Sequence, residues 1–230
     1  NYRETKEQTH VLAAGLLKLG VKKGDKVALL SEGRNAWIIG ELAILHTGAV
    51  NVPLSIKLEE SNDLIFRLVH SEAKYIMVSG SQLKKIRTIA NALSDIKSII
   101  IFDEQVDYEP NEISLTQLKQ WGKDFLLKNP DAVINSSLSI QADDIANISY
   151  TSGTTADPKG IMLTHRNYTA NVEQALTLMT IPPTFRTLII LPLDHCFAHV
   201  AGFYSFMASG ASLATVPVGK TPIESLKNIP

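Results

Sequence analysis

The chain has 230 residues, with 22 Lys and Arg against 23 Asp and Glu, which gives a formal net charge of −1 at pH 7. This balance excludes recognition of nucleic acids or anionic membranes through bulk charge. Hydrophobic residues at 45% and charged residues at 20% are typical of a soluble globular protein, not a disordered one. A single cysteine excludes an intrachain disulfide, and no signal-peptide pattern is visible, so we expect a cytoplasmic protein.

Apolar residues alternate between helical and extended periodicity along the first half of the chain. Gly20 provides a natural stop after the first helix. Ser114–Gln117 forms a capping-box pattern, which predicts a later helix running towards Leu127. The periodicity predicts helices over 4–19, Asn35–Thr47, Ser61–His70 and Gln82–Leu93, and strands over Lys26–Leu30, Ala49–Val52, Tyr75–Val78 and Ser98–Phe102.

The second half repeats this alternation after a polar segment near Asn129. We expect a linker over 131–142 between α/β subdomains at 1–130 and 143–230. Asp143–Asp144 precedes a strand and indicates a solvated turn more readily than a metal-binding pair. Helical segments between strands predict an α/β fold with two mostly parallel sheets and helices on both faces. The predicted elements are strands over Ile145–Tyr150, Ile161–Thr164 and Thr187–Leu191, and a helix over Asn167–Met179.

A long uncharged segment follows at 195–219, if its histidines are neutral. Its length would suffice for a membrane-spanning helix, which needs about 20 residues. However, Gly202, Gly210 and Pro217 interrupt it. We therefore expect a short buried helix ending near Gly210, followed by a strand over Ala211–Val218.

Ligands of parallel sheets bind outside the carboxyl ends of the strands, here after Tyr150 and after Leu191. The loop Thr151–Gly160 holds four hydroxyl residues, two glycines and a lysine. Converging backbone N–H groups, hydroxyls and a cation suit a polyphosphate. The loop is not a Walker A loop, because Pro158 and Gly160 stand where Gly and Ser or Thr are required. The alternative is a polar surface loop whose hydroxyls only satisfy turn backbone.

The run Tyr-Thr-Ser-Gly-Thr-Thr-x-x-Pro-Lys-Gly over 150–160 resembles the phosphate-binding signature of the adenylate-forming enzymes, which include acyl-CoA synthetases, adenylation domains and luciferases. The resemblance continues through Ile161–His165. Upstream, Leu16–Leu30 and Leu45–Leu54 are similar to the opening of the same family. One position departs, because the family usually has Gly where this chain has Ala156. If that position needs a positive φ, Ala costs roughly 1–2 kcal/mol and stiffens the loop.

Leu191–His199 resembles the family segment whose aromatic or histidine side chain lies near the acyl pocket and the phosphates and moves between half-reactions. That role falls on His195, with a hydrogen-bonded histidine of no catalytic role as the alternative. Asp194, His195, Cys196 and His199 also suggest a metal site, but no second ligand pair follows at finger-like spacing. A lone Cys196 in an apolar stretch predicts packing, not catalysis.

The resemblance covers nearly the whole chain but only the first half of the family's sequence. It implies the N-terminal part of an ATP-dependent acid–thiol ligase that uses ATP, Mg²⁺ and coenzyme A, and that is inactive without its C-terminal part. A glutamate sharing the Mg²⁺ and a catalytic lysine would lie in that missing part. By residue carry-over, the phosphates of ATP are held by Thr151, Ser152, Gly153, Thr154, Thr155 and Lys159, with Lys159 also catalytic and Thr151 the Mg²⁺ contact.

The run of Leu191, Pro192, Leu193 and His195 looks most like fatty-acyl-CoA synthetases, so we expect a fatty acid of medium or long chain as the substrate. An adenylation domain that activates an amino acid for a carrier protein is the second interpretation. A third is a non-catalytic module that binds anions or another protein. We expect no nucleic-acid partner and, at most, peripheral contact with a membrane.

Overall fold

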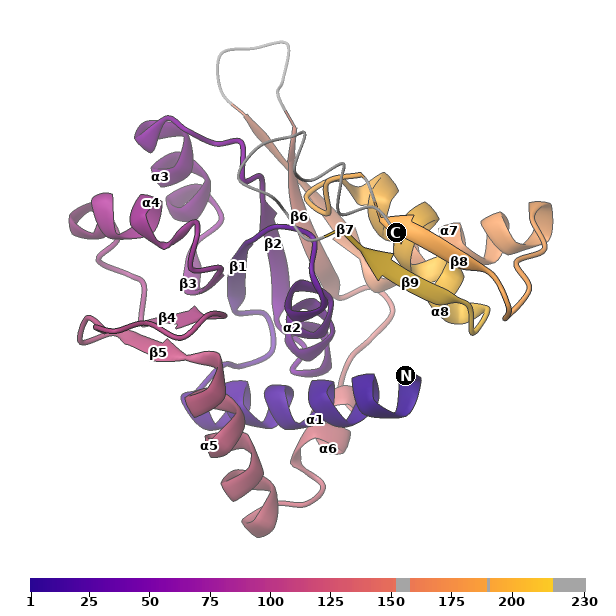
Figure 1. Cartoon of the computed structure of the whole chain (residues 1–230), viewed down its shortest axis with the longest axis horizontal. Coiled ribbons are helices and arrows are strands. Elements are labelled where there is room, and N and C mark those ends of the chain that lie inside the picture. Colours follow the sequence, from indigo (N-terminus) through magenta and orange to yellow (C-terminus); the bar gives the residue numbers. More distant parts are fainter. Residues whose placement is uncertain (152–157, 190, 217–230) are drawn as a thin grey trace.

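Residues 1–151, 158–189 and 191–216 are described in the computed structural model (Figure 1). Helices and strands alternate along the chain as predicted. The helices are α1 (Tyr2–Leu19), α2 (Asn35–His46), α3 (Ser61–His70), α4 (Leu83–Thr88), α5 (Leu115–Lys128), α6 (Ala132–Leu138), α7 (His165–Leu178) and α8 (Ser205–Ala208), with a 3₁₀-helix η1 (Ala90–Ala92) and a π-helix η2 (Ala198–Tyr204). The strands are β1 (Lys26–Leu30), β2 (Val50–Leu54), β3 (Ala73–Val78), β4 (Ser98–Ile101), β5 (Glu112–Ser114), β6 (Ile145–Thr151), β7 (Lys159–Thr164), β8 (Arg186–Ile189) and β9 (Ser212–Thr215).

The strands form two sheets, which confirms the predicted α/β class. One has seven strands in the order β5-β4-β3-β1-β2-β6-β7, all parallel except the antiparallel pair β6–β7. The other is the parallel pair β8–β9. The segment 131–142 contains α6, and the strands β6 and β7 that follow it extend the first sheet. A division into subdomains at that segment stays a prediction.

Both faces of the large sheet are buried, because successive side chains of its central strands enter two separate cores. Val27 and Leu29 pack with residues of α1, α2 and α5 on one face. Ala28 and Leu30 pack with residues of α3 and α4 on the other face (Figure 1). A strand buried on both faces has no polar side for water, which explains the unbroken apolar run in β1. The carboxyl ends of the strands are therefore where polar residues can gather.

The helices α1 and α5 approach each other closely enough to exclude any side chain at two positions. A Cβ atom on Gly15 would lie 2.4 Å from the carbonyl oxygen of Leu118. A Cβ atom on Gly122 would lie 2.0 Å from the carbonyl oxygen of Val11. Both distances are far below van der Waals contact, so this packing of backbone against backbone requires glycine.

Two details of the helices differ from or confirm the predictions. The helix predicted over Gln82–Leu93 is shorter, because the N–H of Ile89 bonds to the carbonyl of Ile86 and the chain tightens into η1. The segment after His195 forms a short helical stretch and then β9, as expected. In the part of the chain that the structure describes, no helix combines the length and apolar character needed to span a membrane.

Candidate functional site

The hairpin of β6 and β7 brings together the two ends of the predicted phosphate-binding loop. Thr151 and Lys159 are direct partners in the antiparallel register. Directly paired residues project from the same face of a sheet, with Cβ atoms roughly 4.5–5.5 Å apart. Both side chains are exposed. The structure thus makes a hydroxyl residue and a lysine direct neighbours at the two ends of the loop, residue types that suit a polyanion site. Ser152, Gly153, Thr154, Thr155 and Ala156 lie outside the described residues.

Tyr150 anchors this hairpin to the helix α3. Its hydroxyl is 2.9 Å from Nδ1 of His70 and donates to the carbonyl of Arg67 at 3.3 Å. Burial raises the pKa of this hydroxyl above its ordinary value, so it stays protonated. A Cβ on its cross-strand partner Gly160 would touch the ring at 3.4 Å and would crowd the Ile148 side chain at 3.1 Å. Because side chains alternate along a strand, the anchor at Tyr150 leaves Thr151 on the opposite face.

The exit from the hairpin is also fixed by local hydrogen bonds. The Thr164 hydroxyl accepts from the backbone N–H of Asn167, and the Asn167 side chain accepts from the N–H of Thr164. This reciprocal capping box starts α7 directly after β7. Asp143, beside the same corner, pairs with Arg166 at 2.7 Å. The Asp143–Asp144 segment is therefore an ion-paired surface turn, as the sequence predicted.

His195 lies on a turn between β8 and η2. Its side chain is 66% exposed, and its Nε2 is 4.0 Å from an oxygen of Asp194. His199, by contrast, is completely buried. No cluster of three or more metal-ligating side chains occurs among the described residues. Cys196 is exposed, and the prediction that it packs in the core is wrong, because the chain turns outward here before entering the π-helix.

The structure does not join all of the predicted site residues. Among the residues that it describes, none of the hydrogen bonds or ion pairs links His195 to Thr151 or Lys159. The turn at His195 is instead tied to the interior through His199, whose Nε2 is 2.6 Å from the carbonyl of Leu193. His199 also faces Glu41, a residue that the sequence analysis did not single out.

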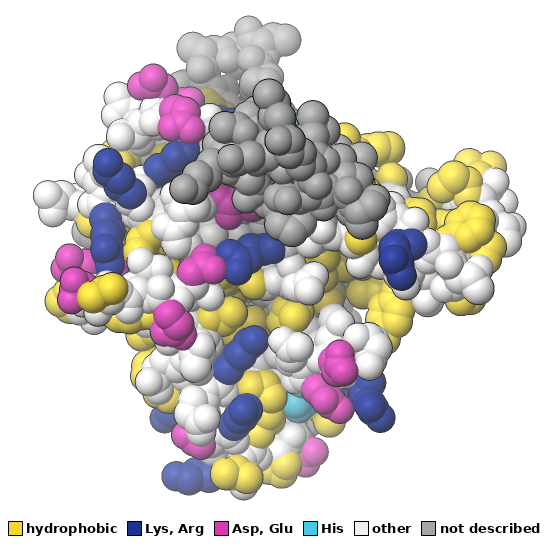
Figure 2. All heavy atoms as spheres, in the orientation of Figure 1, with side chains coloured by type: hydrophobic (Ala, Val, Ile, Leu, Met, Phe, Trp, Pro, Cys, Tyr) yellow, Lys and Arg dark blue, Asp and Glu magenta, His cyan; other side chains and the backbone are white. Residues whose placement is uncertain are grey.

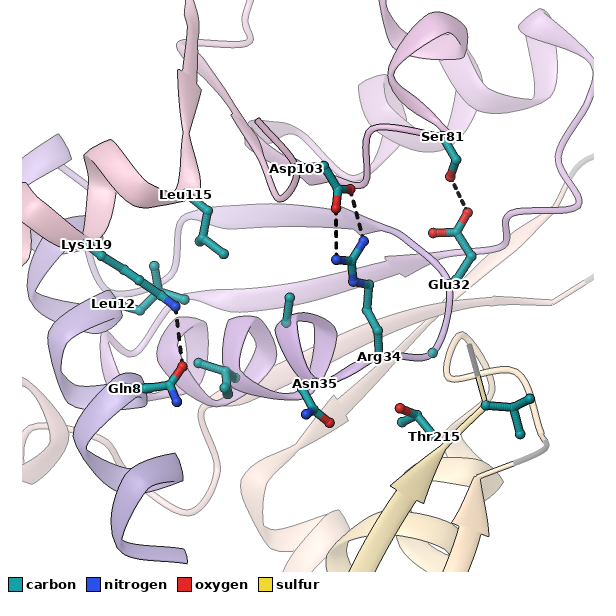
Figure 3. A pocket seen from close by; sticks show the side chains of 14 residues that line it. Gln8, Leu12, Glu32, Arg34, Asn35, Ser81, Asp103, Leu115, Lys119 and Thr215 are labelled. Atoms are coloured by element: carbon teal, nitrogen blue, oxygen red, sulfur yellow. Dashed lines mark hydrogen bonds and ion pairs between the residues drawn. The ribbon is translucent and has the colours of Figure 1, made fainter. Parts of the chain in front are cut away.

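A cavity of about 780 Å³ opens beyond the carboxyl ends of β1, β3 and β4 (Figure 3). Arg34 donates to both carboxylate oxygens of Asp103 at 2.9 Å, and the backbone N–H of Gly80 donates to the same group at 2.8 Å. Glu32 accepts from the Ser81 hydroxyl. Burial opposes ionisation of both carboxyls, but these hydrogen bonds hold the pKa values of Asp103 and Glu32 below their ordinary ranges.

This cavity lies where the strand order reverses, since β2 and β3 flank β1 on opposite sides. Such switch points are the usual ligand sites of open parallel sheets. The sequence analysis missed Glu32, Arg34 and Asp103, although the same rule about strand ends, applied after Leu30 and Phe102, would have found them. Lys and Arg side chains are interspersed with Asp and Glu on the face shown in Figure 2, which agrees with the near-neutral net charge.

Comparison with known proteins places this geometry in context. The chain is 30% identical to the chalcone synthase cfoA of Aspergillus candidus, over 99% of this chain and 8% of that protein. It is 28% identical to the long-chain-fatty-acid–CoA ligase ACSBG2 of Xenopus laevis, over 92% of this chain and 29% of that protein. Further relatives at 27% and 29% identity are named an acyl-CoA synthetase and a long-chain-fatty-acid–CoA ligase.

Among solved structures, the anthranilate CoA ligase AuaEII in complex with anthranoyl-AMP shares the fold, with a TM-score of 0.84. Its sequence is 21% identical, and the match covers 99% of this chain and 42% of that one. The chain thus spans less than half the length of each of these proteins. A family profile described as AMP-binding enzyme matches residues 1–229. With that match, the paired ends of the signature loop and the shared fold, the chain belongs to the family of AMP-binding, adenylate-forming enzymes.

Proposed function

We propose that the chain forms the N-terminal part of a ligase that activates a fatty acid of medium or long chain as acyl-AMP and transfers it to coenzyme A. The observation that carries the proposal is the hairpin, which presents Thr151 and Lys159 as direct neighbours at the ends of the signature loop. A hydroxyl and a cation held together suit a polyphosphate. Membership of the AMP-binding family supports ATP as that ligand, and relatives named fatty-acid ligases support the acid.

The reaction has two steps. A carboxylate oxygen of the acid attacks the α-phosphorus of ATP, and the bond to pyrophosphate breaks. The thiol of coenzyme A then loses its proton and its sulfur attacks the acyl carbon, and AMP leaves with the electron pair of the broken C–O bond. Because the first step brings one anion to another, positioning and charge neutralisation dominate it. Lys159 neutralises charge on the leaving pyrophosphate, and the β- and γ-phosphates are assigned to Thr151, Ser152, Gly153, Thr154 and Thr155.

The chemistry of this corner also fits Mg²⁺. The hydroxyl of Thr151 is exposed beside the loop, and Mg²⁺ in nucleotide sites takes most of its ligands from water and phosphate oxygens. We assign Thr151 as a ligand from this chain, and a glutamate from the C-terminal part of the enzyme as a second. When bound, the ion supplies further neutralisation of the phosphates. We assign His195 to the acyl pocket, on the exposed turn after β8.

The test is acid-dependent exchange of labelled pyrophosphate into ATP, measured on the complete protein without coenzyme A. The acids are a series of fatty acids of increasing length together with a panel of amino acids. Exchange stimulated by fatty acids is the expected result. Stimulation by an amino acid instead would replace the proposed substrate class, and ATP binding without exchange would indicate a non-catalytic anion-binding module. A single cysteine suits the reducing cytoplasm, where we place the enzyme.

Lys159→Ala tests the role of the lysine. Removing one preorganised charge from a transition state costs about 10²-fold in rate, so the exchange rate should fall by that factor. Fatty-acid binding should change little, because the ammonium group contacts phosphate and not the acyl chain. Lys18→Ala is the matched control, since Lys18 is an exposed lysine in the last turn of α1. Unchanged exchange kinetics in Lys159→Ala would remove the assignment.

A further inference from the structure

A row of buried polar side chains crosses the interior between the signature hairpin and the turn that carries His195. Asn147 and Ser149 lie on the same face of β6 as Thr151, because side chains alternate along a strand. Asn147 is the direct partner of Asn51 in the parallel pair β2–β6. Asn51 donates to the carboxyl of Glu41 at 3.1 Å. All of these residues except Thr151 are 5% exposed or less.

Glu41 is the carboxyl at the end of this row, and it has few hydrogen-bond partners. It projects from α2 and is 1% exposed. Its Oε1 receives the Asn51 amide and lies 3.6 Å from Nδ1 of His199, whereas its Oε2 has no hydrogen-bond partner among the described residues. Burial raises the pKa of this carboxyl, although His199, Asn51 and the nearby Tyr204 hydroxyl act in the opposite direction. An apolar side chain of similar size would be easier to bury here.

The hydrogen bond to Leu193 places a proton on Nε2 of His199. The Nε2 atom is 2.6 Å from the carbonyl oxygen of Leu193, and a carbonyl oxygen can only accept. Nε2 therefore carries a proton and donates it. The other nitrogen, Nδ1, lies 3.0 Å from the Tyr168 hydroxyl and faces Glu41. The ring also packs against Trp37, with 5.5 Å between centroids. The helices α2 and α7 and the turn at Leu193 thus hold one imidazole in a single orientation.

The carbonyl of Leu193 belongs to the turn that presents His195. The N–H of His195 donates to the carbonyl of Pro192, and the carbonyl of His195 accepts from the N–H of Ala198. The Leu193 side chain is 4% exposed. The turn is therefore fixed at two points, one through this buried side chain and the other through His199, while His195 itself stays exposed.

We propose that His199, oriented by Glu41 and Tyr168, is a positioning residue that fixes the turn at Leu193 and thereby sets the place of His195 in the reaction. The inference rests on the proposed function, which assigns His195 to the acyl pocket. The proposal explains why a buried carboxyl and a buried imidazole occur together here. Burying both groups costs desolvation free energy, and apolar side chains would fill the same space without that cost. It also explains the π-helix, a form common at functional sites, as the segment that carries this imidazole.

The test compares His199→Gln with His199→Asn in the complete protein. The Gln amide reaches the position of Nε2 and can donate to the Leu193 carbonyl, whereas the shorter Asn amide reaches only the position of Nδ1. We expect Gln to keep kcat for pyrophosphate exchange within about threefold. Asn should lower kcat roughly 10- to 100-fold, with KM for ATP nearly unchanged, as for a displaced catalytic group. Tyr168→Phe removes one of the two orienting contacts of the ring but keeps the bond to Leu193, so it should lower kcat less than His199→Asn does.

A second comparison asks whether His199 acts through His195. In a His195→Ala background, adding His199→Asn should slow exchange no further, because the residue that it positions is already absent. The inference is overturned if Gln and Asn give the same kcat at the same thermal stability. It is also overturned if His199→Asn slows the His195→Ala enzyme as much as it slows the wild type, or if His195→Ala has no effect.

A measurement on the wild type needs no variant to fold. The ¹⁵N shift of His199 Nε2 should be that of a protonated nitrogen that donates a hydrogen bond, and an unprotonated Nε2 would overturn the inference. This readout also separates the two proposals. Absence of exchange with every acid would refute the proposed function. The protonation of Nε2 would still show whether His199 holds the turn.

Discussion

The contact between α1 and α5 gives a quantitative test of the packing that supports the large sheet. Gly122→Ala adds one methyl group, and that carbon would lie 2.0 Å from the carbonyl oxygen of Val11 and 2.8 Å from the backbone nitrogen of Gly15. Both are backbone atoms inside a helix, so no change of rotamer can relieve the overlap. The two helices must separate, which opens the core around Leu12, Leu16 and Leu118.

The size of the effect follows from two opposing terms. Overpacking a core costs about 1–3 kcal/mol, and an overlap with backbone belongs at the upper end, about 3 kcal/mol. Alanine in place of glycine inside a helix returns about 1 kcal/mol of helix propensity. The net loss is about 2 kcal/mol. At about 2–4 °C per kcal/mol for a protein of this size, Tm should fall by about 4–8 °C.

Thermal unfolding followed by circular dichroism measures this loss, with Gly202→Ala as the matched control. A Cβ on Gly202 in η2 would meet no atom of the described residues within 4 Å, so the control variant gains helix propensity without overlap and should keep or slightly raise Tm. An unchanged Tm in Gly122→Ala would refute the backbone contact. Equal losses in the two variants would show that the effect comes from the methyl group in general and not from this interface.

Two further predictions concern the hairpin and an ion pair. Tyr150→Phe removes the hydroxyl that bonds to His70 and Arg67, so the anchored conformation of the hairpin should lose about 1 kcal/mol of stabilisation. ATP binding should then weaken by up to about fivefold. Titration with a fluorescent ATP analogue measures this, and wild-type affinity would contradict it. For Glu112, burial opposes ionisation, but Arg87 and a backbone N–H hold its pKa below the ordinary value. The pair therefore stabilises the fold above the unfolded-state pKa and loses this contribution as pH falls through the folded-state pKa. The difference in free energy of unfolding between wild type and Glu112→Gln should narrow on acidification. A difference that does not depend on pH would contradict this prediction.

The local elements could be predicted because their causes are local. The bounds of β1 and α3 agree with the prediction residue for residue, since an apolar run and an amphipathic pattern end at clear polar positions. The position of β6 beside β2 could not be predicted, because Asn51 and Asn147 pair across a long sequence separation that periodicity does not encode. The helix over Gln82–Leu93 was overextended for a different reason, as its last turn tightened into 3₁₀ geometry.

The site was predictable in part. The signature run indicated Thr151 and Lys159, and the structure adds their direct pairing. Cys196 was misjudged, because apolar neighbours in sequence do not fix the direction in which a turn faces. Glu41 left a signal that could have been used, since it is an acidic residue among the apolar side chains of Trp37, Ile38 and Ile44 in α2. A carboxyl buried among such side chains costs free energy unless it has a partner, and the imidazole that faces Glu41 lies far away in sequence.

The strand β6 shows how function and stability compete in this fold. Ile148 enters the apolar core, and Tyr150 packs beside it and anchors the hairpin to α3. The opposite face carries Asn147, Ser149 and Thr151, where a purely structural strand would carry valine or isoleucine. Replacing a buried polar pair by apolar groups of the same shape is often neutral or stabilising, so stability alone does not require this polar face. The polar face is accounted for if these side chains serve the reaction. Thr151 lies at the exposed end of the strand, and the buried polar residues behind it lie on the side of His199.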